Sequence, residues 1–334
     1  MKLLKKDLPS KLQFFQHLVE SDLAKMDDLI RELISDRSRL IIDITDYLIS
    51  SGGKRLRPIL TIICSKLLGD NKNNRHISLA ASVELIHTAT LLHDDVVDSS
   101  ALRRGNQTAN NKWGNKASIL VGDFLLSQAF KLMVKDGSLP VLDILSSASA
   151  IIAEGEVMQI SSISNIDTTM EGYLEIIESK TAKLFSAACQ VGGIVASMPK
   201  ELEENLRDFG SNLGIAFQII DDVLDYSAKE QELGKSVGDD FREGKITLPV
   251  IFAYQNNNEQ SREFLIKTMC HLDQQPEDLA KIIELLKSSG ALDKSIEIAQ
   301  NHLSLAAKTL ESFPSSTAKD ALTAILQYSL ARSY

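Results

Sequence analysis

The stretch LLHDDVVD, at residues 91–98, decides the fold together with IIDDVLD at residues 219–225. Each stretch carries three aspartates in the order Asp-Asp-x-x-Asp within apolar sequence. On an α-helix, side chains three and four residues apart lie on the same face. Both stretches are therefore predicted to be helices that present their carboxylates on one side.

Three carboxylates on one helix face repel one another unless a cation lies among them. Magnesium is a hard cation that proteins bind through one or two carboxylates together with substrate phosphates. A single acidic motif could be a solvated helix face, but two motifs with the same spacing and apolar flanks favour a metal site. The predicted metal ligands are Asp94, Asp95, Asp98, Asp221, Asp222 and Asp225.

Basic residues accompany the acidic motifs in glycine-bearing segments. The sequence GGKRLRP occupies residues 52–58, and Arg103-Arg104-Gly105 follows the first motif. Lys180-Thr181 lies between the motifs, while Gly234-Lys235 and Lys245 follow the second. Arginine donates paired hydrogen bonds to phosphate oxygens, and lysine supplies a compact charge. Each residue alone could be a surface charge, but together they predict two diphosphate-binding sites.

The remaining sequence predicts an all-α fold. Seven prolines in 334 residues leave room for long helices, and aromatic residues make up only 5%. Residues 40–48 place apolar side chains at i, i+1, i+4, i+7 and i+8, which is the pattern of a helix face. No change of composition marks a linker. The chain is therefore predicted to be one domain over residues 1–334, with its motifs between residues 52 and 249.

Composition restricts the partners and the compartment. A formal charge of -9 and a pI near 5.3 argue against a nucleic-acid partner. Cys64, Cys189 and Cys270 form no CxxC pair, so buried thiols in a reducing compartment are expected. The basic N-terminus has no apolar signal region, and no apolar run reaches 18 residues. A cytoplasmic protein without a transmembrane segment is expected.

The motifs resemble those of the trans-isoprenyl diphosphate synthases of the polyprenyl synthetase family, most closely bacterial enzymes of the octaprenyl diphosphate synthase type. The matching segments run in family order: GGKRLRP (52–58), ELIHTATLLHDDVVDSSALRRG (84–105), GNKASILVGDFLLSQAF (114–130), IIAEGEVMQI (151–160), SKTAKLF (179–185), GIAFQIIDDVLDY (214–226) and GKSVGDDFREGKITLP (234–249). The resemblance implies a single large helical bundle around a central cavity. It also implies a homodimer, with residues 122–126 as the candidate interface.

The resemblance further implies a Mg²⁺-dependent reaction between an allylic diphosphate, such as farnesyl diphosphate, and successive isopentenyl diphosphates. The allylic diphosphate leaves, the double bond of isopentenyl diphosphate attacks the allylic cation, and the released diphosphate takes the proton. The product would be a long all-trans chain, such as octaprenyl, for a quinone. The implied catalytic residues are Lys180, Thr181, Gln218 and Lys235. The implied substrate-binding residues are Lys54, Arg57, His87, Arg103, Arg104 and Lys245.

Product length depends, by the same resemblance, on residues below the first motif. Ala89 and Thr90 lie one helical turn before Asp94 and are small, so the upper tunnel should be open. Met133 is the predicted floor of the tunnel.

Three alternatives stay open at this point. The chain could be a short-chain farnesyl or geranylgeranyl synthase, a non-catalytic subunit of a synthase, or a metal-dependent phosphohydrolase of the His-Asp type.

Overall fold

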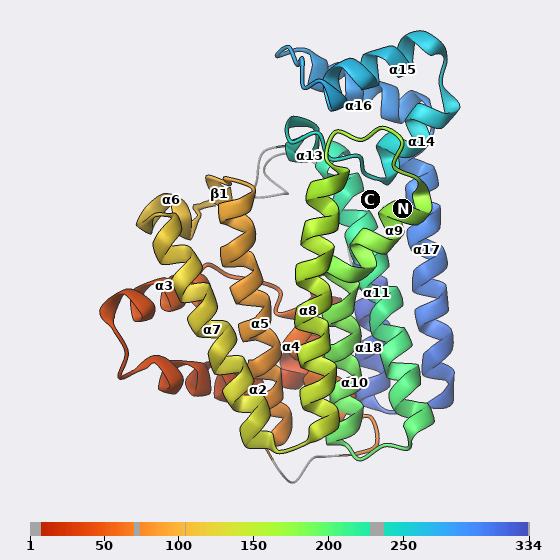
Figure 1. The fold of residues 1–334 in the computed structure, drawn as a ribbon. Helices are drawn as coiled ribbons and strands as arrows, with labels where there is room; N and C mark the ends of the chain where they lie inside the picture. Colours follow the sequence, from red (N-terminus) through yellow and green to blue (C-terminus); the bar gives the residue numbers. More distant parts are fainter. Residues whose placement is uncertain (1–7, 70–73, 104, 228–236, 333–334) are drawn as a thin grey trace.

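The chain folds into a bundle of long helices, as the sequence predicts (Figure 1). The computed structural model describes residues 8–69, 74–103, 105–227 and 237–332. The elements before the first long connection are α2 (Leu8–Ile34), α3 (Arg39–Ser50), α4 (Leu56–Ser65), α5 (Arg75–Val97), β1 (Leu102–Arg103), β2 (Asn106–Gln107), α6 (Ala109–Trp113), α7 (Asn115–Asp136) and α8 (Leu139–Ser162). Strands β1 and β2 pair antiparallel.

The second half of the chain continues the bundle and adds short helices at one end of it (Figure 1). Its elements are α9 (Met170–Ile177), η1 (Glu178–Ala182), α10 (Lys183–Val195), α11 (Lys200–Ser227), α13 (Asp239–Arg242), α14 (Leu248–Asn256), α15 (Glu259–Leu265), η2 (Ile266–Cys270), α16 (Asp278–Ser288), α17 (Ala291–Thr309), η3 (Leu310–Ser312) and α18 (Thr317–Ala331). The elements η1 and η2 are π-helical turns, and η3 is a 3₁₀ turn.

Prolines mark helix starts in this fold. Pro140 and Pro249 occupy the first turn of α8 and α14, where a missing backbone N–H costs nothing. Gly137 ends α7 in the left-handed conformation, at φ 76°. The long helices are possible because these residues fall at their ends.

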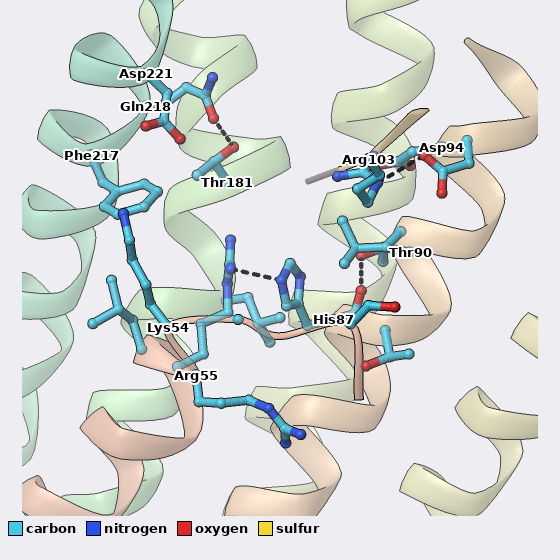
Figure 2. Close-up of a pocket in the computed structure, with 18 of the residues that line it drawn as sticks. Lys54, Arg55, His87, Thr90, Asp94, Arg103, Thr181, Phe217, Gln218 and Asp221 are labelled. Atoms are coloured by element: carbon cyan, nitrogen blue, oxygen red, sulfur yellow. Dashed lines mark hydrogen bonds and ion pairs between the residues drawn. The ribbon is translucent and has the colours of Figure 1, made fainter. Parts of the chain in front are cut away.

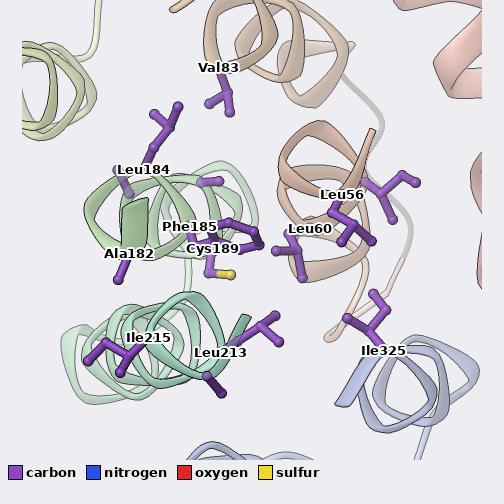
Figure 3. Packing of buried hydrophobic residues seen from close by; sticks show 14 of the residues in the cluster. Leu56, Leu60, Val83, Ala182, Leu184, Phe185, Cys189, Leu213, Ile215 and Ile325 are labelled. Atoms are coloured by element: carbon purple, nitrogen blue, oxygen red, sulfur yellow. The ribbon is translucent and has the colours of Figure 1, made fainter. Parts of the chain in front are cut away.

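Helices α4 and α10 lie at the centre of the core. Phe185 and Cys189 of α10 are fully buried, as is Leu60 of α4 (Figure 3). Burying one large apolar side chain contributes about 1.5–3 kcal/mol. Cys64 and Cys189 are buried free thiols, as expected, while Cys270 is only partly buried.

Two glycines allow the helices around η1 to approach closely. A Cβ at Gly214 of α11 would lie 2.5 Å from the Cα of Ala182, and one at Gly155 of α8 would lie 2.7 Å from the backbone nitrogen of Lys180. Only glycine permits backbones to meet at such distances. The residues that follow Gly214 at intervals of four, Gln218 and Asp222, share its helix face and are therefore directed toward η1.

The two acidic motifs occupy the C-terminal turns of α5 and α11, and these turns lie at the same end of the bundle (Figure 1). The C-terminus of a helix carries a partial negative charge. Carboxylates at this position are destabilised twice, by the helix dipole and by one another. The fold must therefore supply cations or hydrogen-bond donors to them.

Helix α7 has the length and apolar composition to cross a membrane, and 44% of that apolar window is buried in the structure. The core helices of globular proteins meet the same criterion. Within the bundle, α7 packs along α5.

Candidate active site

A cavity of about 1360 Å³ opens between the two acidic motifs. Its wall is formed by residues of α3, α4, α5, β1, β2, α6, α8, η1, α10, α11, α13 and α18. Figure 2 shows Asp94 on one side of this cavity and Asp221 on the other. Most of the predicted site residues line the cavity: Lys54, Arg57, His87, Thr90, Asp94, Asp95, Arg103, Lys180, Thr181, Gln218, Asp221 and Asp222.

Two aspartates of the first motif are held by single cations. Asp95 is almost fully buried, and its Oδ1 accepts a 2.8 Å hydrogen bond from Nε of Arg103. Burial raises the pKa of Asp95, and Arg103 opposes that rise. Asp98 lies 3.6 Å from Nζ of Lys245, which also contacts Glu243.

Lys245 is the residue that ties the first motif to the segment after the second. Burial lowers its pKa, but the carboxylates of Asp98, Asp240 and Glu243 outweigh burial and raise it. Neither Lys245 nor Asp98 lines the cavity. In the structure, Lys245 contacts the carboxylates of Asp98 and Glu243 and does not reach the cavity.

Asp94 belongs to a three-residue cluster with Glu156 of α8 and Lys180 of η1. Nζ of Lys180 lies 2.7 Å from Oε1 of Glu156. Burial raises the pKa of Asp94 from 3.8 to about 7; Lys180 lowers it and Glu156 raises it. The cluster holds two carboxyl groups and one ammonium group inside the cavity.

Asp221 is the aspartate of the second motif that faces the cavity most openly. Its Oδ1 accepts a 2.6 Å hydrogen bond from Nη2 of Arg332, the residue that follows α18. The guanidinium group of Arg332 also lies 4.5 Å from the ring centroid of Phe217. An arginine from the far end of the chain thus neutralises this carboxylate.

Asp222 is buried and held by hydrogen bonds on both oxygens. Tyr173 donates to Oδ2 at 2.6 Å, and the amide of Gln218 donates to Oδ1 at 2.7 Å. The carbonyl oxygen of Gln218 accepts from the hydroxyl of Thr181 at 2.9 Å. Burial raises the pKa of Asp222 to about 6, and the two donors limit that rise. These bonds link the second motif to both ends of the α9–η1 segment.

Asp225, the last predicted ligand, is fully buried outside the cavity lining. Its Oδ2 accepts the backbone N–H of Asp240 at 3.0 Å, and its carbonyl oxygen accepts that of Gly238 at 2.9 Å. These contacts anchor the start of α13 to α11.

The second group of basic residues lies lower in the cavity (Figure 2). Nη1 of Arg57 lies 3.2 Å from Nε2 of His87, and its guanidinium group stacks 4.4 Å from the Phe185 ring centroid. Nζ of Lys54 lies 5.3 Å from the ring centroid of Tyr328. The predicted residues Arg104 and Lys235 lie outside the described residues.

The three chain-length residues differ in position. Thr90 lines the cavity and donates to the carbonyl oxygen of His87 at 2.8 Å. Ala89 and Met133 are buried in the core and do not line the cavity. Their influence on product length stays a prediction.

Glu156, Tyr173 and Arg332 are three residues of the site that the sequence did not indicate. Glu156 lies in a segment that resembles the family, IIAEGEVMQI, but its spacing from the acidic motifs indicates no role. Tyr173 lies 49 residues before its partner Asp222, and Arg332 lies 111 residues after Asp221. No local pattern marks either of the latter two.

The oxygen donors of this cavity suit a hard cation such as Mg²⁺. Carboxylates from two motifs face one space, and cationic side chains for phosphate surround them. Within the part of the chain that the structure describes, no three acidic, histidine or cysteine side chains converge as a ready metal site. The motif carboxylates are bound instead to the side chains described above.

Comparison with known proteins gives one consistent result. The model of the family described as "Polyprenyl synthetase" matches residues 38–286. The octaprenyl diphosphate synthase of Escherichia coli (strain K12) is 40% identical over 321 residues, which cover 96% of this chain and 99% of the relative. The all-trans-nonaprenyl-diphosphate synthase (geranyl-diphosphate specific) of Rhodobacter capsulatus is 41% identical over 314 residues, covering 94% of this chain and 96% of the relative.

Solved structures agree. A decaprenyl diphosphate synthase from Rhodobacter capsulatus superposes with a TM-score of 0.91 at 44% identity, covering 96% of this chain and 98% of the other. A polyprenyl synthase from Caulobacter crescentus CB15, complexed with calcium and isoprenyl diphosphate, gives 0.93 at 42% identity, covering 97% and 98%. The chain therefore belongs to the polyprenyl synthetase family and is a prenyltransferase.

Proposed function

We propose that this protein is a magnesium-dependent trans-prenyltransferase that condenses an allylic diphosphate, such as farnesyl diphosphate, with successive isopentenyl diphosphates. The proposed product is a long all-trans polyprenyl diphosphate, such as octaprenyl, for a quinone side chain. The observation that carries the proposal is the pair of acidic motifs facing one cavity. The family membership and the long-chain relatives support it.

The upper part of the cavity is the proposed site of the allylic diphosphate. Asp94 and Asp221 would hold Mg²⁺ there, with Asp95 and Asp222 beside them, and Asp98 and Asp225 in supporting positions. Bound magnesium would neutralise the charge that develops on the departing diphosphate. Arg103 and Lys180 would donate hydrogen bonds to the same phosphate oxygens, with Lys235 and Lys245 as the further cations proposed from the sequence.

The lower basic group is the proposed site of isopentenyl diphosphate. Lys54, Arg57 and His87 line one side of the cavity, and Arg104 completes the proposed set. The contact between Arg57 and His87 fixes the direction of both side chains. The double bond of the substrate would then face the allylic carbon, which fixes the geometry of the attack.

Thr181 and Gln218 are proposed to shelter the allylic cation. Their hydrogen bond aligns two oxygen dipoles at the wall of the cavity. Apolar side chains, among them Leu184 and Phe217, cover neighbouring parts of the wall and exclude water from the cation.

We further propose that the protein is a cytoplasmic homodimer and that its chain forms one domain. Helix α7 carries apolar side chains that nothing in the structure covers: Leu120 is 68% exposed and Val134 is 66% exposed. Residues 122–126, the interface candidate from the sequence, lie on the same helix. Exposed apolar side chains along one helix favour an interface over contact with water.

Incorporation of labelled isopentenyl diphosphate tests the proposed reaction. The protein should extend farnesyl diphosphate when Mg²⁺ is present and should stop when a chelator removes it. A product that stops at four isoprene units, one more than farnesyl diphosphate, would favour the short-chain alternative. No incorporation under any condition would favour the non-catalytic subunit. Release of inorganic diphosphate or phosphate without condensation would favour a hydrolase.

A further inference from the structure

Glu156 of α8 lies beside Lys180, which is proposed to bind the diphosphate, and near Asp94 of the first acidic motif. Its Oε1 lies 2.7 Å from Nζ of Lys180, and its negative charge raises the pKa of the nearby Asp94 carboxyl group. The side chains of Glu156 and Lys180 are only 19% and 21% exposed. All three residues line the same cavity.

The backbone around this pair is built for close approach. Gly155, the neighbour of Glu156, packs against the backbone nitrogen of Lys180, where a Cβ would lie at 2.7 Å. Lys180 itself lies in the π-helical turn η1, and such turns occur often at functional sites. The contact between α8 and η1 therefore determines that Glu156 and Lys180 meet.

A mostly buried ion pair is weak evidence for stability, because removing both charges from water costs about as much as their attraction returns. A role in binding accounts for the pair better. The ammonium group of Lys180 already has a carboxylate partner, so an incoming diphosphate must compete with Glu156 for it. A divalent cation beside Asp94 would give Glu156 a second positive partner and weaken its hold on Lys180.

We propose that Glu156 makes diphosphate binding at Lys180 depend on the metal: it neutralises Lys180 until a divalent cation lies beside Asp94. This inference rests on the proposed function. Glu156 is a positioning residue in this account, since it acts on the substrate through Lys180.

Calorimetric binding of inorganic pyrophosphate to the full-length protein tests the proposal, with and without Mg²⁺. Glu156→Gln keeps the shape and a hydrogen-bond acceptor but removes the charge. In the presence of chelator it should bind pyrophosphate about five- to tenfold more tightly than the wild type, because a neutral acceptor competes less strongly for an ammonium group. The increase in pyrophosphate affinity that Mg²⁺ produces should be smaller in Glu156→Gln than in the wild type, by a similar factor.

Glu154→Gln is the matched control, because Glu154 lies on the same helix, is exposed and does not line the cavity. It should behave as the wild type does. In a Lys180→Met background, Glu156→Gln should have no further effect on pyrophosphate affinity. Because the single and the double variant are compared by binding, this test remains valid if Glu156→Gln changes the stability of the protein. The KM for the allylic substrate should lose part of its dependence on Mg²⁺ in Glu156→Gln.

Two results would overturn the proposal. If Glu156→Gln and Glu154→Gln both bind pyrophosphate as the wild type does, with and without metal, Glu156 has no coupling role while the proposed function stands. If the wild type binds no pyrophosphate even with Mg²⁺, the proposed function fails and the coupling fails with it.

Discussion

Replacing Asp94 by Asn should stabilise the folded protein at alkaline pH while it removes activity. Asp94 has a pKa of about 7 in the folded chain against an ordinary value of 3.8, chiefly because it is buried. The ionised carboxylate is therefore less favourable in the folded protein than in the unfolded one. Asn has nearly the same shape and no charge to bury.

The size of the effect follows from the pKa. A difference of about 3 units corresponds to about 4 kcal/mol at 1.36 kcal/mol per unit, which is a ceiling. Above pH 7 the wild type carries the full penalty. As the pH falls from 7 to 3.8 the penalty disappears, because Asp94 is then protonated in both states. For a chain of 334 residues the ceiling corresponds to a rise in Tm of about 6 °C.

Thermal unfolding of the metal-free proteins at several pH values measures this difference. Asp94→Asn should exceed the wild-type Tm by several degrees at pH 8 and by almost nothing near pH 4. Adding Mg²⁺ with pyrophosphate should raise the Tm of the wild type more than that of the variant. Turnover in the variant should fall by about two to three orders of magnitude or more.

Asp143→Asn is a suitable control, because Asp143 is exposed on α8 and lies outside the cavity lining. It should leave the Tm and the turnover unchanged. The reasoning is refuted if Asp94→Asn has the same Tm difference at pH 4 and pH 8, or if its turnover is close to normal.

Four further substitutions separate the parts of the site. Lys54→Ala should raise the KM for isopentenyl diphosphate about tenfold with little change for the allylic substrate; an equal effect on both substrates contradicts the assignment. Tyr173→Phe removes a donor to Asp222, so the free energy of unfolding should fall by about 1 kcal/mol and kcat should fall with it; a fully active variant would show that Asp222 needs no such support. Ala89→Tyr should shorten the main product and Met133→Ala should lengthen it, as chromatography of the dephosphorylated products would reveal; an unchanged length would remove both residues from the tunnel.

The helical fold and the centre of the site could be predicted from the sequence. The acidic motifs are local patterns, and helix geometry alone places their aspartates on one face. Gly52 to Arg57 and the Lys180-Thr181 pair were likewise recognisable as segments. That these segments surround one cavity could be predicted only from the family resemblance. A local sequence pattern does not encode which helices become neighbours.

The differences among the six aspartates could not be predicted. By spacing alone, Asp222 and Asp225 are equivalent to Asp221, yet Asp222 is held by Tyr173 and Asp225 anchors α13. These roles depend on contacts between residues far apart in the chain. Arg332 is the extreme case, since its partner Asp221 lies 111 residues earlier.

The most direct test of the two-motif account is the position of the metal in a crystal. The protein should be crystallised with a non-reactive farnesyl diphosphate analogue and Mn²⁺, whose anomalous scattering distinguishes it from water and lighter ions. The account predicts Mn²⁺ peaks at the carboxylates of Asp94 and Asp221, bridged by the diphosphate, with Lys180 on a phosphate oxygen. Peaks at only one motif, or a diphosphate bound away from both, would contradict it.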